Sequence, residues 1–205
     1  MERDAARDAQ IVLEGAGDVD TANMRYIAHM DEPSGSSCNW TASSHRSDFG
    51  SDGMTAAFEF VSTNFPSQDD FKLVLAECQP AESNAWRVPA YVFHLRNHFD
   101  QYLGRIRLRV GWNDDIIKYA GQIGYFVEPA FRGSRYAERA CRLILPLARQ
   151  HGLLQLWITC QPDNIASRRT LERLGAQYAG TLDVPREYPL DAGAERRKAC
   201  FRLST

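Results

Sequence analysis

The sequence predicts a mixed α/β fold in a single domain, and three observations predict it. The chain has 205 residues, 44% of them hydrophobic and 24% charged, which is the composition of an ordinary globular protein. Strand-like segments dominate from about residue 85 onward. Two segments with helical periodicity separate the later strands. Because the order is helices, then three strands, then alternation, we expect antiparallel and parallel pairing in one sheet.

The first 84 residues are predicted to form a strand and helices that are part of this domain or appended to it. Their order is a strand at 10–13 followed by helices at 18–30, 54–63 and 67–78. The last helix is predicted to begin at Ser67, with Asp70 three residues later. Residues 31–53 are rich in Ser, Gly and Asp without an apolar period, so they form a long loop that either shapes a binding site or is an insert.

Residues 85–205 are predicted to form the core of the domain. The expected strands are 88–95, 102–110, 119–127, 154–160, 177–182 and 198–203, the first three forming a meander. Residues 136–150 have apolar side chains along one side of a helix, with Pro146 expected to kink it. Asn164 is predicted to cap a second helix that Gly175 ends.

Charge and cysteine usage exclude several classes of protein. The formal net charge is −2 and the isoelectric point about 6.2, so we expect no nucleic-acid partner. The charged first residues and the absence of any run of eighteen apolar residues predict a cytoplasmic protein without a membrane partner. The five cysteines are widely spaced and never form a C-x-x-C pair, so we predict neither a metal site nor disulfides.

Residues 123–140 are predicted to run as strand, sharp turn and helix. Such a turn directs unpaired backbone N–H groups toward one point at the positive end of the helix dipole, which suits a phosphate group. Gly133, Ser134 and Ala137 are small enough for close approach, while Arg132 and Arg135 add positive charge. Residues 130–175 carry eight arginines against three acidic residues, whereas residues 1–50 carry four against nine. A solvated helix face is the other reading of these arginines.

Two motifs resemble those of the GCN5-related N-acetyltransferase (GNAT) superfamily. Residues 127–137, V-E-P-A-F-R-G-S-R-Y-A, follow its cofactor motif V-x-P-x-x-[RQ]-G-x-G-x-[GA], except that Arg135 replaces a glycine. The second motif, N-x-x-[AS]-x-x-x-x-E-[KR]-x-G, matches from Asn164 to Gly175. The similarity spans residues 87–203, and the segments at 88–90, 121–125 and 159–170 resemble a bacterial branch of predicted acetyltransferases.

This resemblance implies a splayed sheet of six to seven strands flanked by helices, with an acyl-CoA cleft between the fourth and fifth strands. The cofactor would be acetyl-CoA, with its pyrophosphate on the amides from Gly133 to Ala137 and its thioester carbonyl near the N–H of Val127. Since the Cβ of Arg135 disfavours conformations open to glycine, we expect that loop to survive slightly re-aimed. The implied cofactor-binding residues are Phe126, Val127, Arg132, Gly133, Ser134, Arg135, Tyr136, Ala137, Asn164 and Ser167.

The resemblance implies direct transfer of an acetyl group to a primary amine of a small molecule or peptide. This transfer needs a base for the ammonium and an acid for the leaving thiolate. Many members have glutamate at the position of Gln122 and tyrosine at that of Leu171, and this chain has neither. The candidate bases are therefore His94, Asp114 and Asp115, and the candidate donors are Tyr125 and Cys160.

Each of these candidates also has a structural reading, in the core or in a turn. Because the acid and base positions differ from the family pattern, a non-catalytic acyl-CoA-binding or sensing module is the alternative function. The acidic first fifty residues favour a cationic acceptor, although salt screens exposed charges over about 10 Å. A homodimer is compatible with the resemblance.

Overall fold

The computed structural model describes residues 58–186 and 196–205. The predicted strand at 10–13, the helix at 18–30 and the loop at 31–53 lie outside these residues. All the strands and helices belong to one compact unit of the chain. The elements are β1 (Lys72–Gln79), β2 (Ala90–Arg96), β3 (Tyr102–Arg109), β4 (Ile123–Val127), α1 (Tyr136–Gln150), β5 (Gln155–Cys160), α2 (Ile165–Leu174), β6 (Gln177–Asp183) and β7 (Arg197–Ser204).

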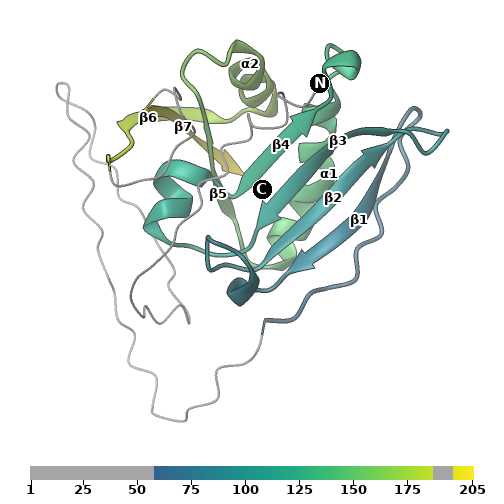
Figure 1. Cartoon of the computed structure of the whole chain (residues 1–205), viewed down its shortest axis with the longest axis horizontal. Helices are drawn as coiled ribbons and strands as arrows, with labels where there is room; N and C mark the ends of the chain where they lie inside the picture. Colours follow the sequence, from purple (N-terminus) through teal and green to yellow (C-terminus); the bar gives the residue numbers. More distant parts are fainter. Residues whose placement is uncertain (1–57, 187–195) are drawn as a thin grey trace, which may run out of the picture. The chain divides into compact units, whose positions relative to one another are not determined.

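The strands form two antiparallel sheets that splay apart between β4 and β5. One sheet has the order β1-β2-β3-β4 and the other the order β5-β7-β6. Figure 1 shows α1 behind the first sheet and the strands of the second sheet diverging from β4. The mixed α/β class, the number of strands and the splay are confirmed. The prediction of parallel pairing within one sheet is wrong for the described residues: all strand pairs there are antiparallel, and the two sheets meet where Gln122, directly before β4, bonds to Trp157 of β5.

Two predicted elements are wrong within the described residues. The segment 67–78 was expected to be a helix, but Lys72–Gln79 is strand β1, paired antiparallel with β2. Its run of Leu, Val and Leu suits a pleated strand, and pairing with β2 outweighs the cap signal at Ser67. Residues 58–63 of the predicted helix 54–63 are not helical either, and residues 54–57 lie outside the description.

The strand predicted at 119–127 begins only at Ile123. Residues Ile116–Ala120 instead form one π-helical turn, whose first amide donates to Asn113 Oδ1 at 2.8 Å. Gly121 ends the turn with φ 70°, a left-handed conformation that glycine adopts at little cost. This turn therefore shortens β4 and places Gln122 at its entrance.

Helix α1 has the predicted bounds and packs its predicted apolar side on the first sheet. The helix runs through Pro146 to Gln150. The core combines α1 with both sheets; its fully buried members include Phe93, Ile106, Ala140, Cys141, Ile144 and Phe201. None of the described helices is long and apolar enough to cross a membrane.

An ion-pair cluster around the nearly buried Glu138 joins α1 to α2. Glu138 Oε2 accepts from Arg173 Nε at 2.7 Å, and Glu138 Oε1 accepts from Arg142 Nη2 at 3.3 Å. Arg142 Nη2 also donates to the Arg173 carbonyl at 2.7 Å, near the end of α2. Burial alone would raise the pKa of Glu138, but its hydrogen bonds to the two arginines outweigh burial and hold that pKa below its usual value.

We expect Glu138→Gln to lower the free energy of unfolding by about 1–2 kcal/mol at neutral pH, because both arginine partners are partly exposed and lose a charged acceptor. The lowered pKa makes this contribution complete above the usual glutamate pKa of about 4.3 and lost as the pH falls through the folded-state value. Urea titrations from pH 7 to pH 3 measure it. Glu172→Gln, at an exposed position of α2, is the control. Equal losses for the two variants would contradict the interpretation.

Candidate active site

Gln122 lies at the point where the two sheets meet, and its side chain is fully buried. Its backbone N–H donates to the Trp157 carbonyl at 2.7 Å, and its Oε1 accepts from the Trp157 N–H at 2.8 Å. Its Nε2 donates to the Gly111 carbonyl at 3.2 Å. The contact is close, since a Cβ on neighbouring Gly121 would lie 2.9 Å from the Thr159 nitrogen. Gln122, at the position where the resemblance implies glutamate in many members, thus joins the two sheets.

Beyond Gln122, one edge of β4 faces the splay. Arg109 N–H donates to the Gln122 carbonyl and Glu128 N–H donates to the Leu103 carbonyl. Gly124 and Phe126, the even-numbered residues within β4, therefore direct their backbone groups toward β3. The N–H groups of Tyr125 and Val127 consequently point to the opposite edge, where no strand of the described chain is paired with β4. This edge offers a row of backbone hydrogen-bonding groups beside the splay.

The turn after β4 leads into α1 through a left-handed backbone. Gly133 has φ 99°, and Arg135 adopts φ 57° and ψ 26° as the residue before the helix. The expectation that Arg135 would re-aim the loop is therefore not met at this residue, because Arg135 takes the left-handed conformation that glycine usually supplies. Arg132 Nε donates to the Val127 carbonyl at 3.0 Å, which ties the turn to the end of β4.

The amides of this turn are available. The N–H groups from Gly133 to Ala137 have no acceptor within residues 58–186 and 196–205, and the first helical bond runs from Arg139 N–H to the Arg135 carbonyl at 3.1 Å. Such unsatisfied donors at a helix N-terminus, together with its dipole, attract an anion. The local geometry thus has the donors that a phosphate group requires.

Tyr125, Cys160 and Ser167 are brought together on the α2 side of the splay. Tyr125 Oη and Ser167 Oγ are 2.7 Å apart. Asn164 caps α2 by accepting from the Ser167 N–H at 3.0 Å, as predicted from the sequence. Cys160 is buried at the end of β5. Two predicted catalytic residues and two predicted cofactor-binding residues therefore lie in one cluster.

Both Tyr125 and Cys160 keep their protons at neutral pH. Burial raises the pKa of the Tyr125 phenol well above its usual value, more than the Ser167 hydrogen bond lowers it. Burial also raises the pKa of the Cys160 thiol, against the lowering effects of Ser167, Arg168 and Lys198. These groups can donate hydrogen bonds, but neither is an anion that could act as a nucleophile or base.

His94 lies elsewhere. It is on β2, opposite Arg105 of β3, and Arg105 is in turn opposite Phe126 of β4. Paired residues share a face of the sheet, whereas Tyr125 is on the other face, so His94 does not join the Tyr125 cluster. Burial and the charges of Arg96 and Arg105 lower the pKa of His94.

The two aspartates lie before the π-helical turn. Asp114 pairs with Lys118 Nζ at 2.7 Å. Burial and the charge of Asp114 raise the pKa of Asp115, although Lys118 opposes this shift. Both residues contribute to the turn that positions Gln122.

Sequence reasoning missed two features of the site. The role of Gln122 depends on a partner 35 residues away, and no local pattern signals it. The second missed feature is a row of three arginines on one face of β3: Arg105, Arg107 and Arg109. Their alternation in the sequence signals this row, because residues two apart on a strand share a face.

The fold resembles several solved acetyltransferases. Mycobacterium smegmatis RimJ, in complex with CoA-disulfide, is 21% identical over 57% of this chain and 53% of that chain, with a TM-score of 0.46. The microcin C7 self-immunity acetyltransferase MccE, in complex with acetyl-CoA and AMP, is 20% identical over 57% and 61%, with a TM-score of 0.44. The ribosomal-protein-S5-alanine acetyltransferase from Vibrio fischeri is 16% identical over 56% and 61%, with a TM-score of 0.46.

The chain thus spans between 53% and 61% of the length of these three structures. The comparison with curated proteins finds no match. The family comparison covers more of the chain, since the model described as "Acetyltransferase (GNAT) domain" matches residues 51–177. This match includes the splay, the turn before α1 and the capped helix α2. The chain therefore belongs to the GNAT acetyltransferase domain family.

Proposed function

We propose that the protein transfers an acetyl group from acetyl-CoA to a primary amine of a small molecule or peptide. The observation that carries this proposal is the set of acceptor-free amides from Gly133 to Ala137, at the start of α1 and next to the open edge of β4. A diphosphate needs several converging N–H donors and positive charge, and this turn has both. The residues present therefore fit coenzyme A.

The chain's groups have separable roles in this proposal. The amides from Gly133 to Ala137 would bind the diphosphate, and the edge of β4 and the start of α2 would orient the pantetheine arm. The Val127 N–H would polarise the acyl carbonyl, a preorganised donor of the kind that stabilises developing negative charge. Acetyl-CoA itself supplies an acyl group activated as a thioester.

The Tyr125 and Ser167 hydroxyl pair would stabilise the leaving thiolate by donating a hydrogen bond to its sulfur. The raised pKa of Tyr125 favours hydrogen-bond donation over full proton transfer, since an ordinary thiol has a pKa of about 8.5. Gln122 cannot act as the base, because it is neutral and its amide is engaged on both sides. The ammonium would lose one proton to water before attack, and after attack the nitrogen would lose a second proton, which would reach the leaving thiolate directly or through water. Orientation beside the polarised carbonyl would supply much of the rate. A cytoplasmic location and a homodimer stay predictions.

A non-catalytic acyl-CoA-binding module is the second candidate, and one observation favours it. The two positions that carry glutamate and tyrosine in many relatives hold an engaged amide, Gln122, and a fully buried Leu171. A thiol-release assay with acetyl-CoA and a panel of amines separates the two functions. Release of thiol that depends on an amine supports transfer, and binding without release for every amine supports the module.

Gly133→Val should weaken acetyl-CoA binding at least tenfold in calorimetry, because a side chain at φ 99° forces the turn away from its present conformation. Gly152→Val is the matched control. Both glycines have positive φ and no atom within 4 Å of an added Cβ, so both variants carry comparable backbone strain. Only the variant at Gly133 should lose affinity. Equal affinities for both variants would show that the turn does not bind the cofactor.

Arg135→Gly should leave the fold intact and raise the free energy of unfolding slightly or leave it unchanged. Glycine relieves about 1 kcal/mol of left-handed strain but adds conformational entropy to the unfolded chain. If the guanidinium contacts a phosphate, acetyl-CoA affinity should fall about tenfold at low salt and less at high salt. Calorimetry at two salt concentrations measures the difference, and unchanged affinity at both would leave phosphate binding to the backbone alone.

Tyr125→Phe should lower kcat about tenfold to a hundredfold while leaving the Kd for acetyl-CoA unchanged, because only the hydroxyl that contacts Ser167 is removed. Tyr178→Phe is the control, since Tyr178 also contacts a hydroxyl, Thr181 Oγ1, at 2.7 Å but is exposed. A kcat that is unaffected by Tyr125→Phe would remove Tyr125 from the proton path.

A further inference from the structure

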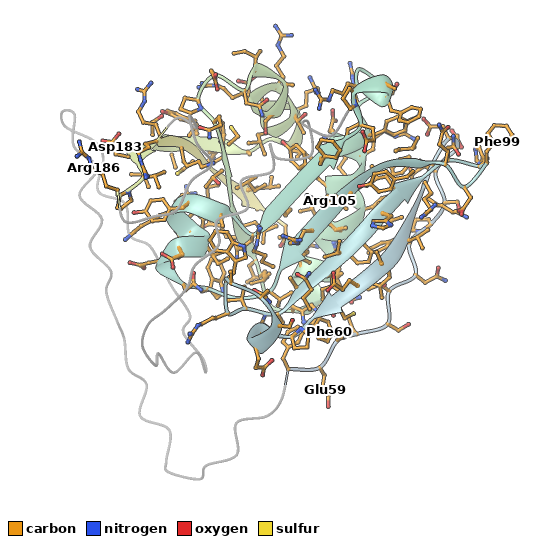
Figure 2. The ribbon with its side chains drawn as sticks, in the orientation of Figure 1. Glu59, Phe60, Phe99, Arg105, Asp183 and Arg186 are labelled. Atoms are coloured by element: carbon orange, nitrogen blue, oxygen red, sulfur yellow. The ribbon has the colours of Figure 1, made fainter. Side chains whose placement is uncertain are left out.

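Three arginines lie in a row on the face of the first sheet opposite α1. Arg105, Arg107 and Arg109 alternate along β3, while the intervening Ile106 and Leu108 are buried in the core. In Figure 2 Arg105 lies over the near face of the sheet, and α1 lies behind these strands in Figure 1. The arginine row therefore shares its face with Phe126 and Gly124, the residues paired with Arg105 and Arg107 on β4.

The inner end of the row is fixed next to the splay. Arg109 is 6% exposed, its Nη1 donates to the Gly121 carbonyl at 3.0 Å, and its guanidinium lies 5.1 Å from the centre of the Trp86 ring. No side chain separates it from β4 at Gly124, where an added Cβ would meet only Arg109 Nη1, at 3.6 Å. A fixed positive charge thus stands beside the strand whose open edge faces the splay.

The charge of this region is positive. Residues 72–109 contain six lysines and arginines against three aspartates and glutamates, a difference of three positive charges. Of the acidic residues, Asp100 pairs with Lys72 at 3.3 Å and Arg96 at 3.4 Å, at the far end of the hairpin. Burial is the main cause of the lowered pKa of His94, and the charges of Arg96 and Arg105 lower it further.

We propose that the acceptor is an amine that also carries an acid group, a carboxylate or a phosphate, and that Arg105 and Arg107 bind this acid group. The inference rests on the proposed acyl transfer. A guanidinium binds either acid through two parallel hydrogen bonds, and both arginines are partly exposed. Both also have partners within the chain, so an acid group would compete with those contacts. The positive charge of this face favours an acceptor that carries an acid group, whereas the acidic composition of residues 1–50 favours a cationic acceptor.

Matched pairs of amines test this inference. Butylamine and 4-aminobutyrate differ by a carboxylate, and ethanolamine and phosphoethanolamine differ by a phosphate. For each amine, calorimetry with the CoA-loaded protein gives a Kd, and thiol release from acetyl-CoA gives kcat/KM. We expect one acidic member to exceed its neutral partner by about tenfold to a hundredfold in both measurements, the range for one charge-assisted interaction. The preferred pair identifies the acid group.

Arg107→Gln and Arg105→Gln should each reduce this preference at least fivefold while leaving the weak binding of the neutral amine unchanged. Arg169→Gln, an exposed position on α2 with the same change of charge, should leave the preference intact. Thiol release without a preference, or a preference that both variants retain, would overturn the anionic acceptor but not the transfer. Arginine-dependent binding without thiol release would overturn the transfer but not the anion site. Neither binding nor release for any amine would overturn both.

Discussion

The two-sheet architecture depends on the hydrogen bonds of Gln122. Its side chain accepts from the Trp157 N–H and donates to the Gly111 carbonyl, while its backbone donates to the Trp157 carbonyl. An ionised carboxylate could accept the first bond but could not donate the second, so an amide suits this buried position better than glutamate. The group at the junction holds the sheets, and beyond it β4 has an open edge.

In the turn before α1, Arg135 replaces a glycine of the motif but keeps the left-handed backbone conformation that glycine usually adopts. A non-glycine residue in the left-handed region costs about 1–2 kcal/mol, and Arg135 adopts it directly before the helix. The surrounding contacts hold it there: Arg132 bonds to the end of β4, and Arg139 forms two hydrogen bonds to Asp70, at 3.0 and 2.5 Å. The Glu138 cluster then ties the same helix to α2. The donors of the turn are therefore held on a helix that is fixed at several points.

The sequence predicted the elements whose signals are local. The bounds of α1 followed from its apolar spacing, and α2 followed from Asn164 at its start and Gly175 at its end, both of which the structure confirms. Strand β1 was predicted as a helix because its identity depends on pairing with β2, which residues 67–78 do not reveal alone.

The site likewise combines features with a local sequence signal and features that depend on contacts between distant residues. The turn was predicted because its motif is continuous, whereas the junction at Gln122 and the distance of His94 from Tyr125 are set by register and splay. Tyr125, Cys160 and Ser167 come from three elements, and only the fold brings them together.

The arginine row and the missing base are connected through electrostatics. A positive field disfavours any second positive charge, so it lowers the pKa of a nearby ammonium, just as Arg96 and Arg105 add to the effect of burial in lowering the pKa of His94. A carboxylate bound by Arg105 and Arg107 would compensate only one of their two charges, so an amine held by that carboxylate would lose its proton more readily than the same amine in water. One shifted pKa unit corresponds to about 1.4 kcal/mol, a tenfold larger share of reactive amine when most of it is still protonated. The residues that select the acceptor would thus also do part of the work of a general base.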